Sequence, residues 1–199
     1  MTRHQFAPSF IRAARLGAVA LVGSLLFGCA AVKLPAPTAS ADSVQQLRSA
    51  NAGPMQAGKF ALAAGKDAGM DKIQGGLRGS TVEAQSGSFS QYLKDQLLAE
   101  LKAAGVYDER STTVIEAQLT DSKLDAAIGT GTGRLAARFT VTRDGKKLYD
   151  KELVVSESWD SSFVGAIALP EAINRYGSFY KKLIGELFKD PEFRSAVAK

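Results

Sequence analysis

Cysteine and histidine, the side chains most often used for nucleophilic catalysis and zinc binding, are nearly absent from this chain of 199 residues. The chain has one cysteine, Cys29, and one histidine, His4. A Ser-His-Asp or Cys-His active site needs an imidazole beside its nucleophile, and the usual zinc sites need several cysteines or histidines. We therefore expect a protein that is not an enzyme, with no catalytic residue, no metal and no cofactor.

The sequence before Cys29 has the layout of a secretory signal. Its start is cationic and contains no acidic residue, with arginines at Arg3, Arg12 and Arg15. The apolar run Leu16–Phe27 is shorter than the roughly 20 residues that a membrane span needs, but it fits the apolar segment of a signal. We expect a signal peptide over residues 1–28 with cleavage after Gly28, which would also remove His4.

The residues at the expected cleavage site, Leu26-Phe27-Gly28-Cys29, resemble the lipobox of bacterial lipoproteins. The resemblance implies that the Cys29 thiol receives lipid, palmitate included, and becomes the mature N-terminus. It also implies sorting to the outer membrane, because Ala30 is not aspartate. The alternative is an ordinary signal that leaves Cys29 as a free thiol, which would be a liability in an oxidising compartment.

The charge of the chain gives no reason to expect nucleic acid as a partner. The formal net charge is +5, with 25 basic and 20 acidic residues. Three of the basic residues belong to the expected signal peptide, so the remainder is close to neutral. Nucleic-acid binding normally leaves a strongly basic footprint.

Other motifs have a more ordinary interpretation than the chemistry they suggest. The run Gly129–Arg134 alternates glycine with threonine, but it leads into a strand and not into the helix that a phosphate loop requires. Two carboxylate pairs, Asp121 with Asp125 and Glu157 with Asp160, could serve a cell-wall glycan hydrolase only across a groove. We interpret the glycine run as a flexible connection and the carboxylates as surface charges.

A stretch of weak periodicity between Asp160 and Leu169 is the candidate for partner binding. Its apolar residues, with the tryptophan before it, are Trp159, Phe163 and Ile167. An exposed apolar cluster of this kind marks an interaction site. The alternative is that these side chains cover an open end of the core.

Composition divides the expected mature protein into a tether and a domain. Residues 29–58 are rich in Ala, Ser, Pro and Gly, which is typical of a flexible linker. Residues 59–199 contain the periodic segments and are expected to form one periplasmic domain.

Within that domain, apolar spacing predicts two amphipathic helices and about four strands. One helix follows Ser86 or Ser88 and ends at Gly105, and the other runs from about Pro170 to Phe188. The strands are expected at residues 59–64, 113–119, 135–142 and 147–158, with a hairpin turn at Asp144-Gly145. We expect an α+β fold, an antiparallel sheet with both helices on one face.

This arrangement resembles the YajG-like family of small bacterial envelope lipoproteins. The resemblance lies in the lipobox, the helix Phe89–Leu101 that ends at Ala104-Gly105, the strand meander, and the close at Asp190-Pro191-Glu192-Phe193. It implies a non-catalytic envelope lipoprotein that binds an envelope protein or lipid. The layout is also similar to LptE-like lipoproteins, which implies, as an alternative, an accessory subunit of a lipid or lipopolysaccharide transport machine.

Overall fold

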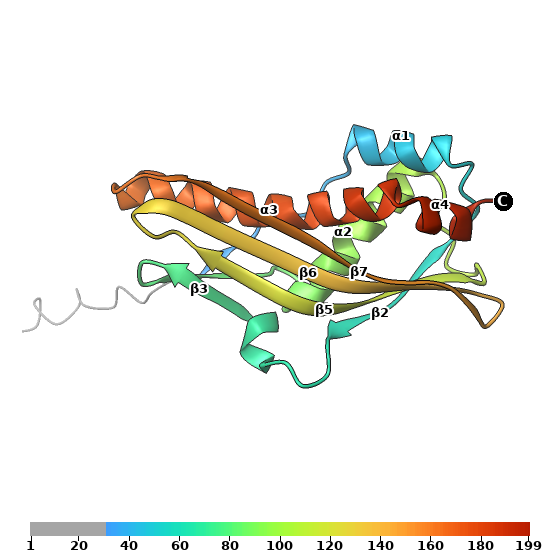
Figure 1. Ribbon diagram of the computed structural model, residues 1–199, viewed down its shortest axis with the longest axis horizontal. Coiled ribbons are helices and arrows are strands. Elements are labelled where there is room, and N and C mark those ends of the chain that lie inside the picture. Colours follow the sequence, from blue (N-terminus) through green and yellow to red (C-terminus); the bar gives the residue numbers. More distant parts are fainter. Residues whose placement is uncertain (1–30) are drawn as a thin grey trace, which may run out of the picture. The chain divides into compact units, whose positions relative to one another are not determined.

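The computed structural model describes residues 31–199, which contain seven strands and four α-helices (Figure 1). The expected signal peptide, Gly28 and Cys29 lie outside the described residues. The α+β class is confirmed, but the described part contains two sheets where one was expected. The larger sheet has the order β2-β5-β6-β7 and consists of β2 (Gln56–Leu62), β5 (Thr113–Asp125), β6 (Gly129–Arg143) and β7 (Lys146–Ser161).

The prediction of a wholly antiparallel sheet is wrong for the larger sheet. Strands β5, β6 and β7 form an antiparallel meander, but β2 pairs with β5 in parallel. The connection from β2 to β5 includes the helix α2, and such a crossover returns the chain to the end from which it started. The parallel pair therefore follows from the order of elements.

The hairpin between β6 and β7 forms where the sequence predicts it. Asp144 and Gly145 both have positive φ, 50° and 78°, as a two-residue turn matched to strand twist requires. The pairing places Val141 opposite Tyr149 and Phe139 opposite Lys151.

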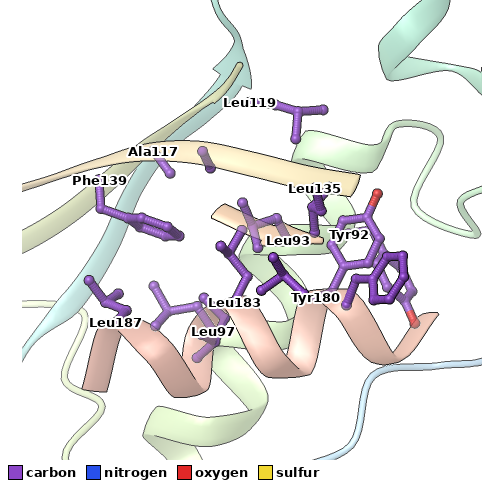
Figure 2. Close-up of a cluster of buried hydrophobic side chains, with 14 of the residues drawn as sticks. Tyr92, Leu93, Leu97, Ala117, Leu119, Leu135, Phe139, Tyr180, Leu183 and Leu187 are labelled. Carbon is purple, nitrogen blue, oxygen red and sulfur yellow. The ribbon is translucent and has the colours of Figure 1, made fainter. Parts of the chain in front are cut away.

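Two helices cover the inner face of the larger sheet and form the core with it (Figure 2). They are α2 (Phe89–Ala104) and α3 (Gly165–Lys189). Helix α2 begins after Ser88, whose side chain accepts a hydrogen bond from the Gln91 amide, and ends at Gly105 with φ 75°. Both boundaries are as predicted. The sheet contributes alternating residues to this core: Ile115, Ala117, Leu119, Leu135, Ala137, Phe139 and Val141.

Helix α3 begins five residues earlier than predicted. It ends before Asp190, but a further helix follows that residue. Pro170 lies inside α3 and not at its first position. Asp190 instead begins a further helix, α4 (Pro191–Val197), by accepting hydrogen bonds from the amides of Glu192 and Phe193. Asp-Pro therefore acts as a start signal here, since proline suits the first position of a helix.

A second sheet of three short strands has the order β1-β4-β3. Strand β1 (Val32–Lys33) is parallel to β4 (Ser80–Glu83), and β3 (Ile73–Leu77) is antiparallel to β4. A single 3₁₀ turn, Ala68–Asp71, precedes β3. This sheet was not expected, because strands of only two to five residues leave little periodic signal.

The prediction of a flexible tether over residues 29–58 is wrong from Ala31 onward. Helix α1 (Ala41–Ser49) packs on α2 and α3, and Leu34, Leu47 and Met55 are fully or almost fully buried. The Ser40 amide donates to the buried Glu100 carboxylate over 2.9 Å. The composition of the segment is that of a linker, but a few well-placed apolar residues are enough to dock it.

Candidate functional site

Three turns meet at one end of the domain and are joined by a single side chain, Arg78. The turns connect β3 with β4, β5 with β6, and β7 with α3 (Figure 1). The Arg78 Nε donates to the Ala126 carbonyl over 2.7 Å, and Nη1 donates to the Phe163 carbonyl over 3.0 Å. Nη2 donates to the Ser162 carbonyl at 2.6 Å, with longer contacts to Ser161 Oγ and the Ala127 carbonyl.

Arg78 is therefore a charged donor that clamps the turns through acceptors that are all neutral. A guanidinium has five N–H donors in a rigid plane, which suits it to bind several carbonyls at once. Its backbone has a φ of 51°, in the left-handed region, at the turn beside Gly79. Hydrogen bonds that involve a charged donor are stronger than neutral ones. The three turns are consequently held in one fixed arrangement.

The clamped turns and the start of α3 present large apolar side chains to solvent. Phe163 is 78% exposed, Ile128 70% and Ile167 59%, and Val164 is exposed beside them. We refer to Ile128, Phe163, Val164 and Ile167 as the apolar end. Side chains of this size are usually buried, so a group of them on fixed backbone indicates an interaction surface.

The three residues expected to form a partner-binding patch fall into two groups. Phe163 and Ile167 belong to the apolar end, whereas Trp159 is 7% exposed and belongs to the core. The Trp159 ring faces the Arg175 guanidinium, 5.2 Å from the ring centroid. Strand alternation explains the difference, because Trp159 is in phase with Val155 on the inner face of β7.

An apolar groove of about 500 Å³ adjoins the apolar end along the first turns of α3. One wall belongs to β1 and the residues after it, and the other to α3 before and after Pro170. The side chains that define it are Val32, Pro35, Leu169, Pro170 and Ile173. We call it the α3 groove.

The glycine run at the start of β6 makes room for aromatic rings. A Cβ added at Gly131 would overlap the Trp159 indole, and one added at Gly133 would overlap the Phe179 ring. Residues 129–134 pair with β7 as a regular strand, so they are not the flexible connection that was expected. They also do not lead into a helix N-terminus, as a phosphate loop would.

The predicted carboxylate pairs do not form an acid–base site in the described part of the chain. Asp121 is paired with Arg134 over 3.0 Å, and Glu157 is paired with Lys182. Asp125 and Asp160 are exposed. No group of three potential ligands is placed to hold a metal ion among residues 31–199.

A cavity of about 410 Å³ on the open face of the larger sheet also contains carboxylates, Glu116 and Asp150. Hydrogen bonds from Lys147 and Arg138 lower the pKa of Asp150, and they outweigh the opposing effect of desolvation. Glu116 accepts from the Lys59 amide over 3.2 Å. A general acid needs a raised pKa, so the shift at Asp150 is in the wrong direction for that role.

Sequence reasoning missed the residue that organises the candidate site. Arg78 lies in a stretch rich in glycine and charge, and its partners are 48 to 85 positions away. No local pattern indicates such contacts. The positive φ at a turn next to Gly79 is compatible with the sequence but is not required by it.

Comparisons with known proteins give structural likenesses only. No family model matches the chain, and no curated protein matches it. Protein XCC0632 from Xanthomonas campestris is 13% identical, with a TM-score of 0.47 over 79% of this chain and 91% of that one. Protein CT253 from Chlamydia trachomatis is 11% identical, with a TM-score of 0.44 over 73% and 98%. A minor lipoprotein from Acinetobacter baumannii is 13% identical, with a TM-score of 0.41 over 70% and 91%.

The matched structures thus include a bacterial lipoprotein, but identity and TM-score are too low to transfer a role. None of the helices described between residues 31 and 199 is long and apolar enough to cross a membrane. The function of this chain has to be inferred from its own residues.

Proposed function

We propose that this protein is an envelope lipoprotein, anchored through lipid on Cys29 to the inner leaflet of the outer membrane. Its periplasmic domain is a non-catalytic binding module. The observation that supports binding most strongly is the apolar end, where exposed Phe163, Ile128 and Ile167 are presented by turns that Arg78 holds in place. A surface that is already ordered loses little conformational entropy when it binds.

The anchor is supported by the sequence Leu26–Cys29 and by the cationic, apolar segment before it. Each buried methylene of an acyl chain contributes about 0.8 kcal/mol, and more than one chain gives stable attachment. Lipidation of Cys29 therefore explains how a protein without a membrane-spanning helix among its described residues would stay at a membrane.

The non-catalytic role is supported by the state of the carboxylates. Those proposed for acid–base chemistry are exposed or paired with arginine and lysine, and the pKa of Asp150 is lowered. Glu100 has a raised pKa, because it is buried, but its oxygens accept from Ser40 and Gln96 inside the α1–α2 contact. The bond from Ser40 joins α2 to the residue that precedes α1, so Glu100 supports packing.

Mass spectrometry of the protein purified from membranes tests the anchor. The N-terminal peptide is expected to begin at Cys29 and to contain acyl chains. An N-terminal peptide that begins elsewhere, or an unmodified Cys29, would contradict the proposal. Ala30→Asp is the matched variant for sorting: it should keep the lipid and move the protein to the inner membrane.

A second candidate function, as an accessory subunit of a lipid or lipopolysaccharide transport machine, is favoured by the α3 groove. Its lining is mainly apolar, as an acyl chain would require. Organic extraction of the purified protein should then release lipid in a fixed ratio to protein. Substitution Leu169→Asp should abolish this lipid while leaving the lipid on Cys29 in place.

A further inference from the structure

We propose that the apolar end rests on the same bilayer that holds the acyl chains of Cys29, with Phe163, Ile128 and Ile167 inserted at the lipid surface. This inference rests on the proposed lipidation of Cys29. It goes further by stating which face of the domain meets the membrane, and it identifies lipid as the occupant of that face.

The distance along the chain between the anchor and the domain is short. Val32 is already paired with Val82 in β1, and it is the third residue after Cys29. Three residues span at most about 11 Å when fully extended. A linker this short cannot hold the domain away from the bilayer, so the end of the domain at which Val32 lies must face the lipid.

Val32 also lies beside the apolar end. It lines the α3 groove together with Gly165 and Leu169, on the first turns of α3. Ile167 belongs to the same turns, and Phe163 immediately precedes them. Figure 1 shows that the start of α3 and the turns β3–β4 and β5–β6 lie at one end of the domain.

The backbone carbonyls at the apolar end are also suited to contact with lipid. A loop that enters the lipid surface must not present bare carbonyl groups, because each unsatisfied group is costly away from water. Arg78 donates to the carbonyls of Ala126, Phe163 and Ser162 within 3.0 Å and to that of Ala127 over 3.4 Å. Four carbonyls of the turns that present Phe163 and Ile128 are therefore paired within the domain, and the large exposed side chains there are apolar.

The charges near the apolar end favour apolar insertion into the bilayer over electrostatic attraction to charged headgroups. Exposed Lys33 is accompanied by exposed Asp125 and Asp160. The mixture gives no strong net charge, so docking should depend on apolar insertion and change little with salt.

The test places a fluorophore at the apolar end of the full, lipidated protein. Cys29 is the only cysteine and is consumed by lipid, so Phe163→Cys provides one thiol for an environment-sensitive label. Ile128→Cys gives a second site. Leu148→Cys is the matched control, because Leu148 is an exposed apolar residue just after the β6–β7 turn. The proteins are reconstituted in phosphatidylethanolamine–phosphatidylglycerol vesicles with nitroxide lipids.

We expect the labels at 163 and 128 to shift to shorter wavelength and to be quenched by nitroxide lipid several-fold more than the label at 148. Equal quenching at the three sites would overturn the proposal. A wavelength shift without lipid quenching, growing with the protein-to-lipid ratio, would also overturn it, since contact between copies would then cover the surface. Failure of the anchor itself would be seen separately, as intact protein that lacks acyl mass and does not float with vesicles.

Discussion

At the scale of single residues, Arg78 is the side chain on which the candidate site depends. The three turns face one another with carbonyl groups, which accept hydrogen bonds and cannot pair among themselves. The Arg78 guanidinium supplies the donors that connect them. Of its five hydrogen bonds, one comes from Nε, one from Nη1 and three from Nη2, whose two N–H groups are shared among three acceptors.

Arg78→Ala is expected to lower the free energy of unfolding by about 2–3 kcal/mol, since it leaves several carbonyls without their charged donor. Arg78→Lys should recover only part of this loss, because an ammonium cannot reproduce the planar fork. Urea denaturation measures the change, and hydrogen exchange should rise in residues 126–129 and 161–165. Arg110→Ala, at an exposed arginine, is the control and should have little effect.

The buried Glu100 gives a prediction about pH. Burial raises its pKa above the usual value, so ionisation is less favourable in the folded protein than in the unfolded chain. The stability that Glu100 contributes is then present below its unfolded pKa, near 4.3, and is lost as pH rises through the folded pKa. Glu100→Gln removes this titration.

The difference in unfolding free energy between Glu100→Gln and the wild type should therefore shift in favour of the variant as pH rises from 4 to 7. Thermal or urea unfolding across this range checks it. Glu109→Gln, at an exposed glutamate, should show no such trend. A constant difference for the Glu100 variant would show that its carboxylate is as well solvated in the folded protein as in the unfolded chain.

At the scale of elements, β6 shows why a motif has to be interpreted with its neighbours. The glycines that suggest a phosphate loop stand on the inner face of the strand, where the rings of Trp159 and Phe179 occupy the space of a side chain. The aromatic residues are 28 and 46 positions away from their glycines. Such complementarity has no local signature, and it could not be predicted from the run itself.

Gly133→Ala is expected to destabilise the protein by about 1–3 kcal/mol, because the added methyl group must displace the Phe179 ring. Chemical denaturation measures this loss. Gly75→Ala is the matched control, since a Cβ there meets open space, and it should change stability by less than about 0.5 kcal/mol. Equal effects of the two substitutions would contradict the packing role of the glycine run.

Elements with strong periodicity could be predicted, and those held by distant contacts could not. The stripe of Phe89, Leu93, Leu97 and Leu101 is buried along α2 as its spacing predicts, and the alternation in β5 to β7 gives the meander. Strand β1 has only two residues and exists because β4 offers it an edge. The predicted start of α3 at Pro170 is five residues too late. Proline is more typical of a first turn than of a position inside a helix, so the sequence pattern favoured the later start.

At the scale of the whole described domain, the segment expected to be a tether is part of the fold. Leu47 is 1% exposed in α1, and the Tyr92 hydroxyl donates to the Pro35 carbonyl over 2.8 Å. Average composition could not predict this, because two or three buried side chains among small and polar residues leave the mean hydropathy low.

Leu47→Ala should therefore cost about 2–5 kcal/mol of stability, as expected for truncation of a fully buried leucine. A flexible tether would give no change. Gln45→Ala, on the exposed face of the same helix, should be close to wild type. In limited proteolysis, the first cleavage of the Leu47 variant should fall within residues 35–55.

The folding of residues 31–58 also bears on what the proposed lipid anchor would do. A linker of 30 residues would let the domain move far from the membrane, whereas a linker of two or three residues fixes its distance and its orientation. Under the proposed lipidation of Cys29, the apolar end lies where the domain meets lipid. In that arrangement the anchor and the apolar end would be two parts of one attachment.

Fractionation of wild type and Cys29→Ser tests the proposed attachment of this protein to the outer membrane through Cys29. Both proteins would be expressed in a Gram-negative host and separated on a sucrose gradient. We predict wild type in the outer-membrane fraction and Cys29→Ser in the soluble periplasmic fraction with unchanged domain stability. Cys29→Ser that still sediments with the outer membrane would contradict the account.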